Sequence, residues 1–508
     1  MSDLFVDLVA PNGREIKLPT GLFINNTWVR SSSGQKIKSI NPFNEEEICS
    51  VEAASAADVD AAVGAARSAF SDSSPWRTMS GTERGALMHK LAELMDARAR
   101  DLATLETWDN GKPYAVSLGE DLPEAAACLR YYAGWADKVH GQTIPTTVRK
   151  FAYTVAQPVG VCAQIVPWNY PLVMASWKLG PALAAGNVVV LKPAEQTPLS
   201  ALLLALLVAE AGFPPGVVNV VNGLGAEAGA ALVAHPDVDK VAFTGSTAVG
   251  REVMRSAGGT LKKVTLETGG KSPLLVFPDA DLEQAAKWAF VGGMSNQGQV
   301  CTATSRLLVH ESVAERFLAL LLAEVHAAAR LGDPFAPETT QGPQVSLAQR
   351  DKILAFVRDA EAQGAVIETG GGGGSGSSSG GSSGKKGYFV APTVLSGVTP
   401  AMRAFREEIF GPVVSLTRFG SEDEAVRLAN DSAYGLAAAV FSRDVERAHG
   451  LAARLQAGMV WVNSSNDPDP RVPFGGVKQS GVGRELGEAG LAGYVEIKAV
   501  HVNMGSKL

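Results

Sequence analysis

The sequence predicts a large α/β protein built around a doubly wound parallel sheet of the kind that binds nucleotides. Short runs of strand-forming residues alternate with helical segments, and these runs cover residues 159–166, 187–191, 217–221 and 238–243. Parallel strands require such crossover helices. In addition, a chain of 508 residues that is 46% hydrophobic can bury a large core and is too long for one ordinary domain. We therefore expect two or three domains.

The amino-terminal part predicts short antiparallel strands followed by helices. Hydrophobic and polar residues alternate over 21–50, which indicates an edge sheet. Residues 53–70 and 82–105 are rich in alanine and carry apolar side chains at helical spacing, with Thr82 as the expected cap of the second helix. Another helix is predicted over 120–139, and polar strand-like sequence follows over 142–158.

A second α/β unit is expected to start near Lys263. Its predicted strands lie at 264–266, 274–277, 307–309, 413–416, 438–441 and 459–462, with helices between them. Within this unit, residues 370–384 are glycine and serine almost throughout. Such a composition cannot bury a core, so it predicts a flexible surface loop.

Composition indicates small-molecule partners. The net charge of −7 and the pI near 5.7 leave no excess of lysine and arginine for nucleic acid or a membrane surface. The longest apolar run, 199–209, is too short to span a membrane and predicts a buried helix. Cys49, Cys128, Cys162 and Cys301 form no CxxC pair, which favours a reducing compartment and argues against disulfides and a zinc site.

The two ends of the sequence bear on its location. The first residues lack the basic start and apolar run of a secretory signal. The last three, Ser506, Lys507 and Leu508, form the tripeptide that the peroxisomal import receptor binds at a free carboxyl terminus. The sequence therefore predicts a peroxisomal protein, with a cytoplasmic one as the alternative if the tripeptide occurs by chance.

The stretch 297–306, Gln-Gly-Gln-Val-Cys-Thr-Ala-Thr-Ser-Arg, carries the candidate nucleophile, Cys301. A reactive thiol needs access and nearby dipoles, and small and polar neighbours provide that setting. A single cysteine is more often a small core residue, so the assignment depends on other motifs.

Two of these motifs supply groups for a reaction at Cys301. Asn169 lies between aromatic residues at the end of the first strand of the sheet and can direct amide N–H groups at an oxyanion, although a turn-forming asparagine beside proline is more common. Glu267 stands at a strand end loosened by Gly269 and Gly270, as expected of a general base.

Two strand ends predict a nucleotide site. Gly245 and Ser246 join a strand to a helix whose first backbone N–H groups can bind a pyrophosphate. Glu195 follows another strand, where a carboxylate accepts hydrogen bonds from ribose hydroxyls and repels a 2′-phosphate, so it favours NAD over NADP. The alternatives are a turn that needs glycine for its backbone and an ordinary ion pair between Lys192 and Glu195.

Together these motifs resemble those of the NAD(P)-dependent aldehyde dehydrogenase superfamily, from about residue 20 to residue 500. The match consists of PWNYP at 167–171, LKPAE at 191–195, FTGS at 243–246, LETGGKSP at 266–273, GQVC at 298–301, EEIFGPV at 407–413 and PFGGVKQSGVGRE at 473–485. The resemblance implies an aldehyde dehydrogenase-like fold with an NAD-binding domain over 20–140 and 160–266 and a catalytic domain over 267–475. It also implies intersubunit β segments over 141–159 and 486–503, which would make a homodimer or homotetramer.

The resemblance also assigns roles to single residues. It makes Cys301 the nucleophile, with Asn169 and the Cys301 backbone N–H as the oxyanion hole. It makes Glu267 the base that activates water for thioester hydrolysis, with Lys178 and Glu485 as a proton path behind it. The positions that match the family's NAD site are Ile165, Trp168, Lys192, Glu195, Gly245, Ser246, Glu408 and Phe410.

Within the superfamily the sequence is most similar to the betaine aldehyde and aminoaldehyde dehydrogenases. Tyr170 and Trp177 match aromatic positions of that group's substrate channel, and aromatic faces attract ammonium groups. Ser295 stands where that group has tryptophan and Ala115 where it has an acidic residue, so the expected cation site is incomplete.

The loop that carries Asp467 and Asp469 is expected near the channel entrance and is a candidate to compensate, unless its Asp-Pro pairs serve only the turn. Broad specificity for aliphatic or aromatic aldehydes is the alternative. An enzyme that passes its acyl group to coenzyme A is disfavoured by Glu267, and an inactive scaffold by the presence of both Cys301 and Glu267. Thr268 departs from the family, which usually has leucine at this position beside the nicotinamide.

Overall fold

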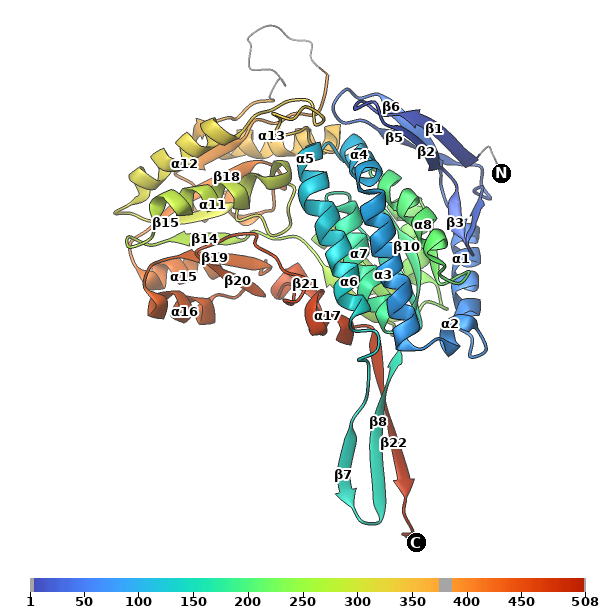
Figure 1. The fold of residues 1–508 in the computed structure, drawn as a ribbon. Helices are drawn as coiled ribbons and strands as arrows, with labels where there is room; N and C mark the ends of the chain where they lie inside the picture. Colours follow the sequence, from blue (N-terminus) through green and yellow to red (C-terminus); the bar gives the residue numbers. More distant parts are fainter. Residues whose placement is uncertain (1–3, 374–385, 507–508) are drawn as a thin grey trace.

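The computed structural model describes residues 4–373 and 386–506, which form two α/β lobes and a projecting three-stranded arm (Figure 1). Residues 374–384 of the glycine- and serine-rich run lie outside the described residues, as do Lys507 and Leu508 of the terminal tripeptide. In the described ranges, no helix has the length and apolar character needed to cross a membrane.

The first lobe is built on an eight-stranded sheet with the strand order β21-β13-β12-β9-β10-β11-β3-β4. The strands are β3 (Leu22–Ile24), β4 (Thr27–Val29), β9 (Val161–Ile165), β10 (Val188–Lys192), β11 (Val218–Val220), β12 (Lys240–Thr244), β13 (Lys263–Glu267) and β21 (Gly481–Val482). The five central strands are parallel, and β3, β4 and β21 are antiparallel additions at the edges. The predicted doubly wound sheet is confirmed.

Strand β9 marks the point where the strand order reverses. The chain continues from β9 to β10 and β11 on one side, and then to β12 and β13 on the other. Open α/β sheets bind ligands beyond the carboxyl ends of their strands at such a point. The segments that follow β9, β10, β12 and β13 therefore converge on one place.

The position of β13 corrects one prediction. The sequence pattern assigns residues 264–266 to the second unit, but β13 pairs in parallel with β12 of the first sheet, with Phe243 opposite Leu266. Both sheets are built from buried β-branched runs, so a run by itself does not reveal which sheet it joins.

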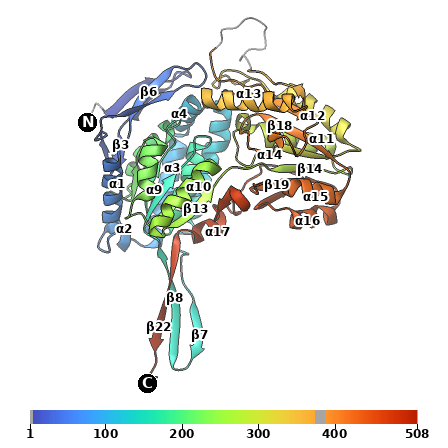
Figure 2. The same ribbon diagram turned by 180° about the vertical axis from the view of Figure 1, so that it is seen from behind.

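Helices cover both faces of this sheet. One face is covered by α3 (Gly81–Ala97), α4 (Ala99–Asn110), α6 (Leu122–Ala133), α7 (Pro171–Ala184) and α8 (Leu199–Ala211) (Figure 1). The other is covered by α1 (Ala56–Ala69), α9 (Ala230–Ala234) and α10 (Thr247–Ala257) (Figure 2). The short helices α2 (Pro75–Thr78) and α5 (Tyr114–Val116) lie between longer ones. Every residue of α7 is buried, because this helix packs against the sheet and against α6.

Three details of the amino-terminal part differ from the prediction. The single helix expected over 82–105 is two helices, α3 and α4, which meet at Arg98. Ser80 rather than Thr82 caps α3, and it forms a capping box with Glu83. The helix expected over 120–139 ends at Ala133. In addition, the hairpin of β1 (Phe5–Val9) and β2 (Glu15–Pro19), which forms a two-stranded sheet, was not predicted. Strands β5 (Lys36–Ile40) and β6 (Glu47–Glu52) form another two-stranded sheet.

The second lobe is a seven-stranded sheet with the order β16-β17-β18-β15-β14-β19-β20, parallel except for β16. Its strands are β14 (Pro273–Val276), β15 (Arg306–His310), β16 (Val366–Thr369), β17 (Thr393–Ser396), β18 (Val413–Phe419), β19 (Ala437–Phe441) and β20 (Met459–Val462). One core layer contains α11 (Leu282–Met294) and α12 (Ala314–Ala328). The other contains α13 (Leu347–Ala362), α14 (Arg403–Arg406), α15 (Glu422–Asn430) and α16 (Val445–Arg454).

The arm consists of β7 (Thr143–Thr147), β8 (Lys150–Pro158) and β22 (Val495–Asn503), and it extends away from both lobes (Figures 1 and 2). Helix α17 (Gly487–Ala492) leads into β22. Strand β22 pairs with β8 over nine residues, and Ile144, Phe151 and Ile497 on this arm are exposed apolar side chains. The strands predicted for these segments are confirmed.

Candidate active site

The carboxyl ends of four strands bring the predicted site residues together. Asn169 follows β9, Glu195 follows β10, Ser246 follows β12, and Glu267 is the last residue of β13. The second lobe adds Cys301, which precedes β15. A cavity of about 250 Å³ lies between the lobes at this place.

Nine of the predicted residues line this cavity: Trp168, Asn169, Tyr170, Trp177, Gly245, Ser246, Cys301, Glu408 and Phe410. Glu267, Lys178 and Glu485 are buried and are not part of its wall. Ile165, Lys192, Glu195, Ser295 and Asp467 do not line it either. The structure therefore joins the predicted nucleophile, oxyanion donor and part of the cofactor site in one cavity.

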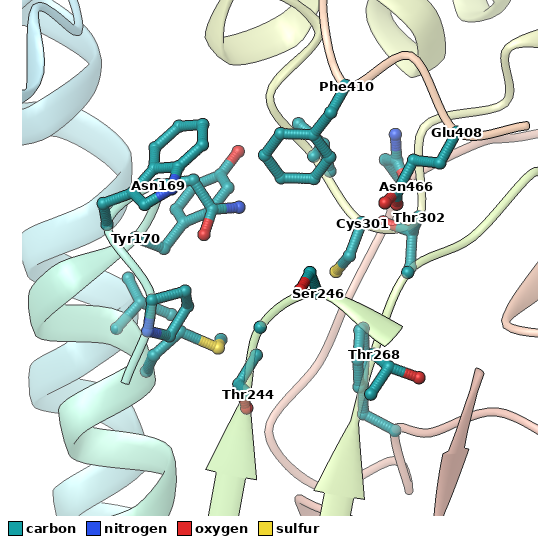
Figure 3. A pocket seen from close by; sticks show the side chains of 18 of the residues that line it. Asn169, Tyr170, Thr244, Ser246, Thr268, Cys301, Thr302, Glu408, Phe410 and Asn466 are labelled. Atoms are coloured by element: carbon teal, nitrogen blue, oxygen red, sulfur yellow. The ribbon is translucent and has the colours of Figure 1, made fainter. Parts of the chain in front are cut away.

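Cys301 is half-buried, and its sulfur faces the open middle of the cavity, with Asn169 and Tyr170 across from it (Figure 3). Burial raises the pKa of the Cys301 thiol to about 12, and the negative charges of Glu267 and Glu408 add to this effect. The backbone N–H groups of Thr302 and Cys301 oppose it. The resting group is therefore a thiol, so attack on a carbonyl requires that a base remove its proton.

Asn169 is held in place by two hydrogen bonds in the second lobe. Its side-chain Nδ2 donates to the backbone carbonyl oxygen of Gln299 at 2.9 Å, and its backbone carbonyl oxygen accepts from Nδ2 of Asn296 at 2.9 Å. An amide nitrogen carries two hydrogens, so the second N–H of Asn169 is free to donate to an oxyanion. The amide is thus pre-positioned rather than turn-forming, as an oxyanion donor must be.

Glu267 is buried, and neither of its carboxylate oxygens has a hydrogen-bond partner among residues 4–373 and 386–506. Burial raises the pKa of Glu267 well above its ordinary value, and the charge of Glu485 adds to the shift, while Lys178 and Arg484 oppose it. A carboxylate with a raised pKa accepts a proton readily near neutral pH, which is the property of a general base.

Lys178 and Glu485 form a buried ion pair close to Glu267. The Lys178 ammonium also donates to the hydroxyl of Thr244 at 2.6 Å, and Thr244 lines the cavity. Burial of two charges is costly unless they are paired and hydrogen-bonded, as they are here. The arrangement can pass a proton between the cavity and the interior of the first lobe.

The first turn of α10 fits a pyrophosphate. Ser246 is the cap of this 11-residue helix, so unpaired backbone N–H groups and the positive end of the helix dipole face the carboxyl edge of the sheet. On the neighbouring strand end, the Lys192 ammonium lies 3.4 Å from Glu195, so the alternative ion pair between them is present. The pair does not occupy every acceptor site of the Glu195 carboxylate, which leaves room for a ribose hydroxyl.

Trp168 and Phe410 both line the cavity and contact each other edge to face, with ring centres 5.3 Å apart. Glu408 accepts a hydrogen bond from the backbone N–H of Gly270 at 2.8 Å. Gln349 and Lys352 of α13 also line the cavity, and neither was predicted. They are polar residues three apart on a helix without any motif, so no local signal identified them.

The substrate end of the cavity is aromatic. Tyr170 and Trp177 line it as predicted, and Phe474, which was not predicted, contacts Trp177 with a ring separation of 4.8 Å. Neither Asp467 nor Asp469 of the Asp-Pro loop lines the cavity: Asp467 is exposed, and Asp469 forms an ion pair with Arg471 at 2.5 Å. No contact within the cavity, among the residues that the structure describes, therefore supports the expected compensation by their charges. Asn466 and Pro468 of this loop line the cavity in their place.

Glu124 is the main residue that the sequence analysis missed. It lies on α6 and lines the same cavity as Tyr170 and Trp177. Burial raises the pKa of Glu124 to about 7, and the charge of Asp121 adds to this, while Lys112 and the Trp177 indole lower it. No sequence pattern points to it, because Glu124 lies off the apolar stripe that Leu122, Ala125 and Leu129 form on α6.

Comparison with known proteins identifies similar sequences and structures. A model of the aldehyde dehydrogenase family matches residues 28–500. An aldehyde dehydrogenase of Emericella nidulans is 50% identical over the full length of both chains. An aldehyde dehydrogenase of Bacillus cereus, solved in complex with NAD⁺, is 48% identical with a TM-score of 0.92, covering 96% of this chain and 97% of that one. A betaine aldehyde dehydrogenase of Staphylococcus aureus, also with NAD⁺, is 40% identical with a TM-score of 0.93, covering 97% and 96%.

Proposed function

Because this chain belongs to the aldehyde dehydrogenase family and is an oxidoreductase that uses NAD, we propose that the aldehyde it oxidises is cationic, either betaine aldehyde or an ω-aminoaldehyde, and that the product is the carboxylic acid. One observation carries the choice of substrate. Glu124 lines the same cavity as the aromatic residues Tyr170, Trp177 and Phe474.

The first half of the reaction is covalent. The Cys301 sulfur attacks the aldehyde carbon as its proton passes to a base, and the carbonyl oxygen becomes an oxyanion. The free N–H of Asn169 and the backbone N–H of Cys301 stabilise this oxyanion. When bound, NAD accepts the hydride that leaves the tetrahedral carbon, and a thioester on Cys301 remains.

The second half is hydrolysis. Glu267 takes a proton from water, the resulting hydroxide adds to the thioester carbon, and the C–S bond breaks with Cys301 as the leaving thiolate. The proton moves from Glu267 toward Lys178 and Glu485, which lie next to it. A water-activating base favours release of a free acid over transfer of the acyl group to coenzyme A.

The aromatic walls and Glu124 suit a cation for two reasons. Ring faces attract ammonium groups by about 0.5–2 kcal/mol per contact, which corresponds to a preference of about 2- to 30-fold. One face of the Tyr170 ring already holds the Lys112 ammonium, 3.7 Å from the ring centre. A carboxylate in a poorly hydrated cavity attracts a cation more strongly than one in water does. Together the aromatic rings and Glu124 make a site for a cation, although Ser295 stands where a tryptophan was expected and Ala115 where an acidic residue was expected.

Broad specificity is the second candidate. Val173, Met174 and Phe474 give the cavity an apolar character that also suits neutral aldehydes, and the relative from Emericella nidulans is named only as an aldehyde dehydrogenase. An inactive scaffold is disfavoured because Cys301, Asn169 and Glu267 are all present in a connected arrangement.

A matched pair of substrates tests the proposal. Betaine aldehyde and 3,3-dimethylbutanal have nearly the same shape, but only the first carries a positive charge. We expect a higher kcat/KM for betaine aldehyde in the wild type and loss of this preference in Glu124→Gln, which keeps the size of the side chain. A wild-type enzyme that prefers 3,3-dimethylbutanal, hexanal or benzaldehyde to every cationic aldehyde would establish broad specificity instead.

Two further proposals concern assembly and location. The exposed edges of the arm and its apolar side chains Ile144, Phe151 and Ile497 support a homo-oligomer, a dimer or a tetramer, in which the arm pairs with another subunit. The terminal tripeptide Ser506-Lys507-Leu508 supports import into peroxisomes by the receptor for that signal.

A further inference from the structure

The backbone around Glu267 is fixed by hydrogen bonds on both sides. Its carbonyl oxygen accepts from the backbone N–H of Gly245 at 3.1 Å. The backbone N–H of Thr268 donates to the carbonyl oxygen of Ser480 at 2.9 Å, and the Ser480 hydroxyl donates to the carbonyl oxygen of Gly269 at 2.7 Å. Residues 267–269 are thereby attached to β12 and to the segment that precedes β21.

The side chain of Glu267, in contrast, is unattached. Both carboxylate oxygens lack a hydrogen-bond partner in the part of the chain that the structure describes. One of them, Oε1, lies only 2.6 Å from the position that a Cβ on Gly475 would occupy, so the absence of a side chain at Gly475 makes this resting place possible. The base can therefore move by side-chain torsion on a backbone that stays in place.

Thr268 contributes to this fixation through its side chain. Its hydroxyl donates to the carbonyl oxygen of Gln479 at 2.7 Å, and its methyl group faces Gly250 of α10, where an added Cβ would lie 2.7 Å from it. The side-chain oxygen of Gln479 in turn accepts from Arg251 of α10. Thr268 thus connects the residue next to the base with the helix whose first turn fits the cofactor.

We propose that Thr268 is a positioning residue for thioester hydrolysis, because its hydroxyl bond to Gln479 holds the backbone from which Glu267 moves. This inference rests on the proposed role of Glu267 as the water-activating base. It assigns a purpose to the departure from the leucine expected at this position. A leucine has no hydroxyl to donate, so the attachment to Gln479 belongs to threonine and serine only.

The experiment compares Thr268→Val, which keeps the branched shape but removes the hydroxyl, with Thr268→Ser, which keeps the hydroxyl. Each full-length enzyme is mixed rapidly with saturating NAD and propanal. The first turnover of NADH, the steady-state rate, and the acyl-enzyme on Cys301 after acid quenching are recorded, the last by mass spectrometry. The ratio of steady-state to first-turnover rate is taken within one preparation, so a partly unfolded fraction does not change it.

We expect the valine variant to form NADH in the first turnover at the wild-type rate, to hydrolyse the thioester about five-fold more slowly, and to accumulate acyl-enzyme. The serine variant should hydrolyse within about two-fold of wild type. Equal behaviour of the two variants, or a parallel loss of both rates in the valine variant, would overturn the inference.

Glu267→Gln separates the claim that Glu267 is the base from the claim that Thr268 positions it. If it hydrolyses normally, the role of Glu267 fails and the inference fails with it, whereas a blocked Glu267→Gln beside a wild-type-like Thr268→Val refutes Thr268 alone.

Discussion

At the scale of single residues, the site combines groups that must exchange protons with groups that must not move. Burial raises the pKa of Cys301 to about 12 and that of Glu267 well above its ordinary value. At rest the Cys301 thiol therefore keeps its proton, and the Glu267 carboxylate accepts a proton readily. Asn169, by comparison, is fixed through Gln299 and Asn296. Fixed donors beside mobile proton carriers are what a covalent reaction with a developing oxyanion requires.

Replacing the nucleophile gives the first prediction. Cys301→Ala should lower NADH production at least about 1,000-fold, because no other group in the cavity can form the thioester. NAD binding should persist, since the first turn of α10 and the side chains of Trp168 and Phe410 are unchanged. Activity assays and titration calorimetry measure the two effects, and sustained turnover in this variant would remove Cys301 from its role.

The second prediction concerns pH and Glu124. With a pKa of about 7, its charged fraction falls from about nine-tenths at pH 8 to about one-tenth at pH 6. Because a bound cation interacts with the charged form, kcat/KM for betaine aldehyde should fall over this range relative to that for 3,3-dimethylbutanal. Glu124→Gln should abolish the relative change. A ratio that stays constant with pH in the wild type would exclude Glu124 as the cation's partner.

At the scale of elements, α6 and α7 build the substrate end of the cavity. The two helices pack against each other, and this contact brings Glu124 of α6 to the same cavity as Tyr170 and Trp177. Helix α7 begins at Pro171, directly after the strand-end segment that carries Asn169. One element therefore links the oxyanion donor to the substrate wall.

The third prediction tests where α3 begins. Ser80→Ala should destabilise the protein by about 1 kcal/mol, because the hydroxyl of Ser80 accepts from the backbone N–H of Glu83 and completes a capping box. Thr82→Ala, within the first turn, should cost less than about half of that. Thermal melting of both variants measures the difference, and an equal loss in the two would contradict the observed start of the helix.

At the scale of the whole molecule, the two lobes meet at the active-site cavity while the arm extends away from both (Figure 1). Strands β8 and β22 come from distant parts of the chain and pair over nine residues. A three-stranded sheet with exposed edges is a ready surface for another subunit.

The fourth prediction therefore concerns assembly. Ile497 on β22 is 62% exposed, so Ile497→Asp should leave the fold of one subunit intact but shift the oligomer toward smaller species. Val9, 69% exposed on the amino-terminal hairpin, is the matched control, and Val9→Asp should not change the assembly. Light scattering measures the molar mass of the assembly formed by each of the two variants. A wild type that is monomeric at working concentration would contradict the proposal at once.

The fifth prediction concerns location. A fluorescent protein fused to the amino terminus should direct the chain to peroxisomes, and deletion of Ser506-Lys507-Leu508 should leave it in the cytosol. Microscopy of both fusions in the same cells provides the comparison. Identical cytosolic distributions would refute the targeting role of the tripeptide.

The sequence by itself determined the features that depend on neighbours along the chain. The β-branched runs specified most strands of both sheets, although β16, β17 and β21 were not predicted. The segments around Asn169, Ser246, Glu267 and Cys301 specified the chemistry, because a strand end, a helix start and a reactive side chain are local patterns. The break between α3 and α4 at Arg98 was missed although it is local, since apolar spacing continues across it and hides the interruption.

The tertiary structure alone decided which distant segments meet. It placed β13 in the first sheet, as the family resemblance implied and the strand pattern did not, because strand pairing depends on partners that no single run contains. It brought Glu124 to the cavity, so the negative charge beside the aromatic rings comes from α6 and not from the loop expected to supply it. Long-range packing sets the sign and position of charge in a cavity, and a linear sequence does not state that packing.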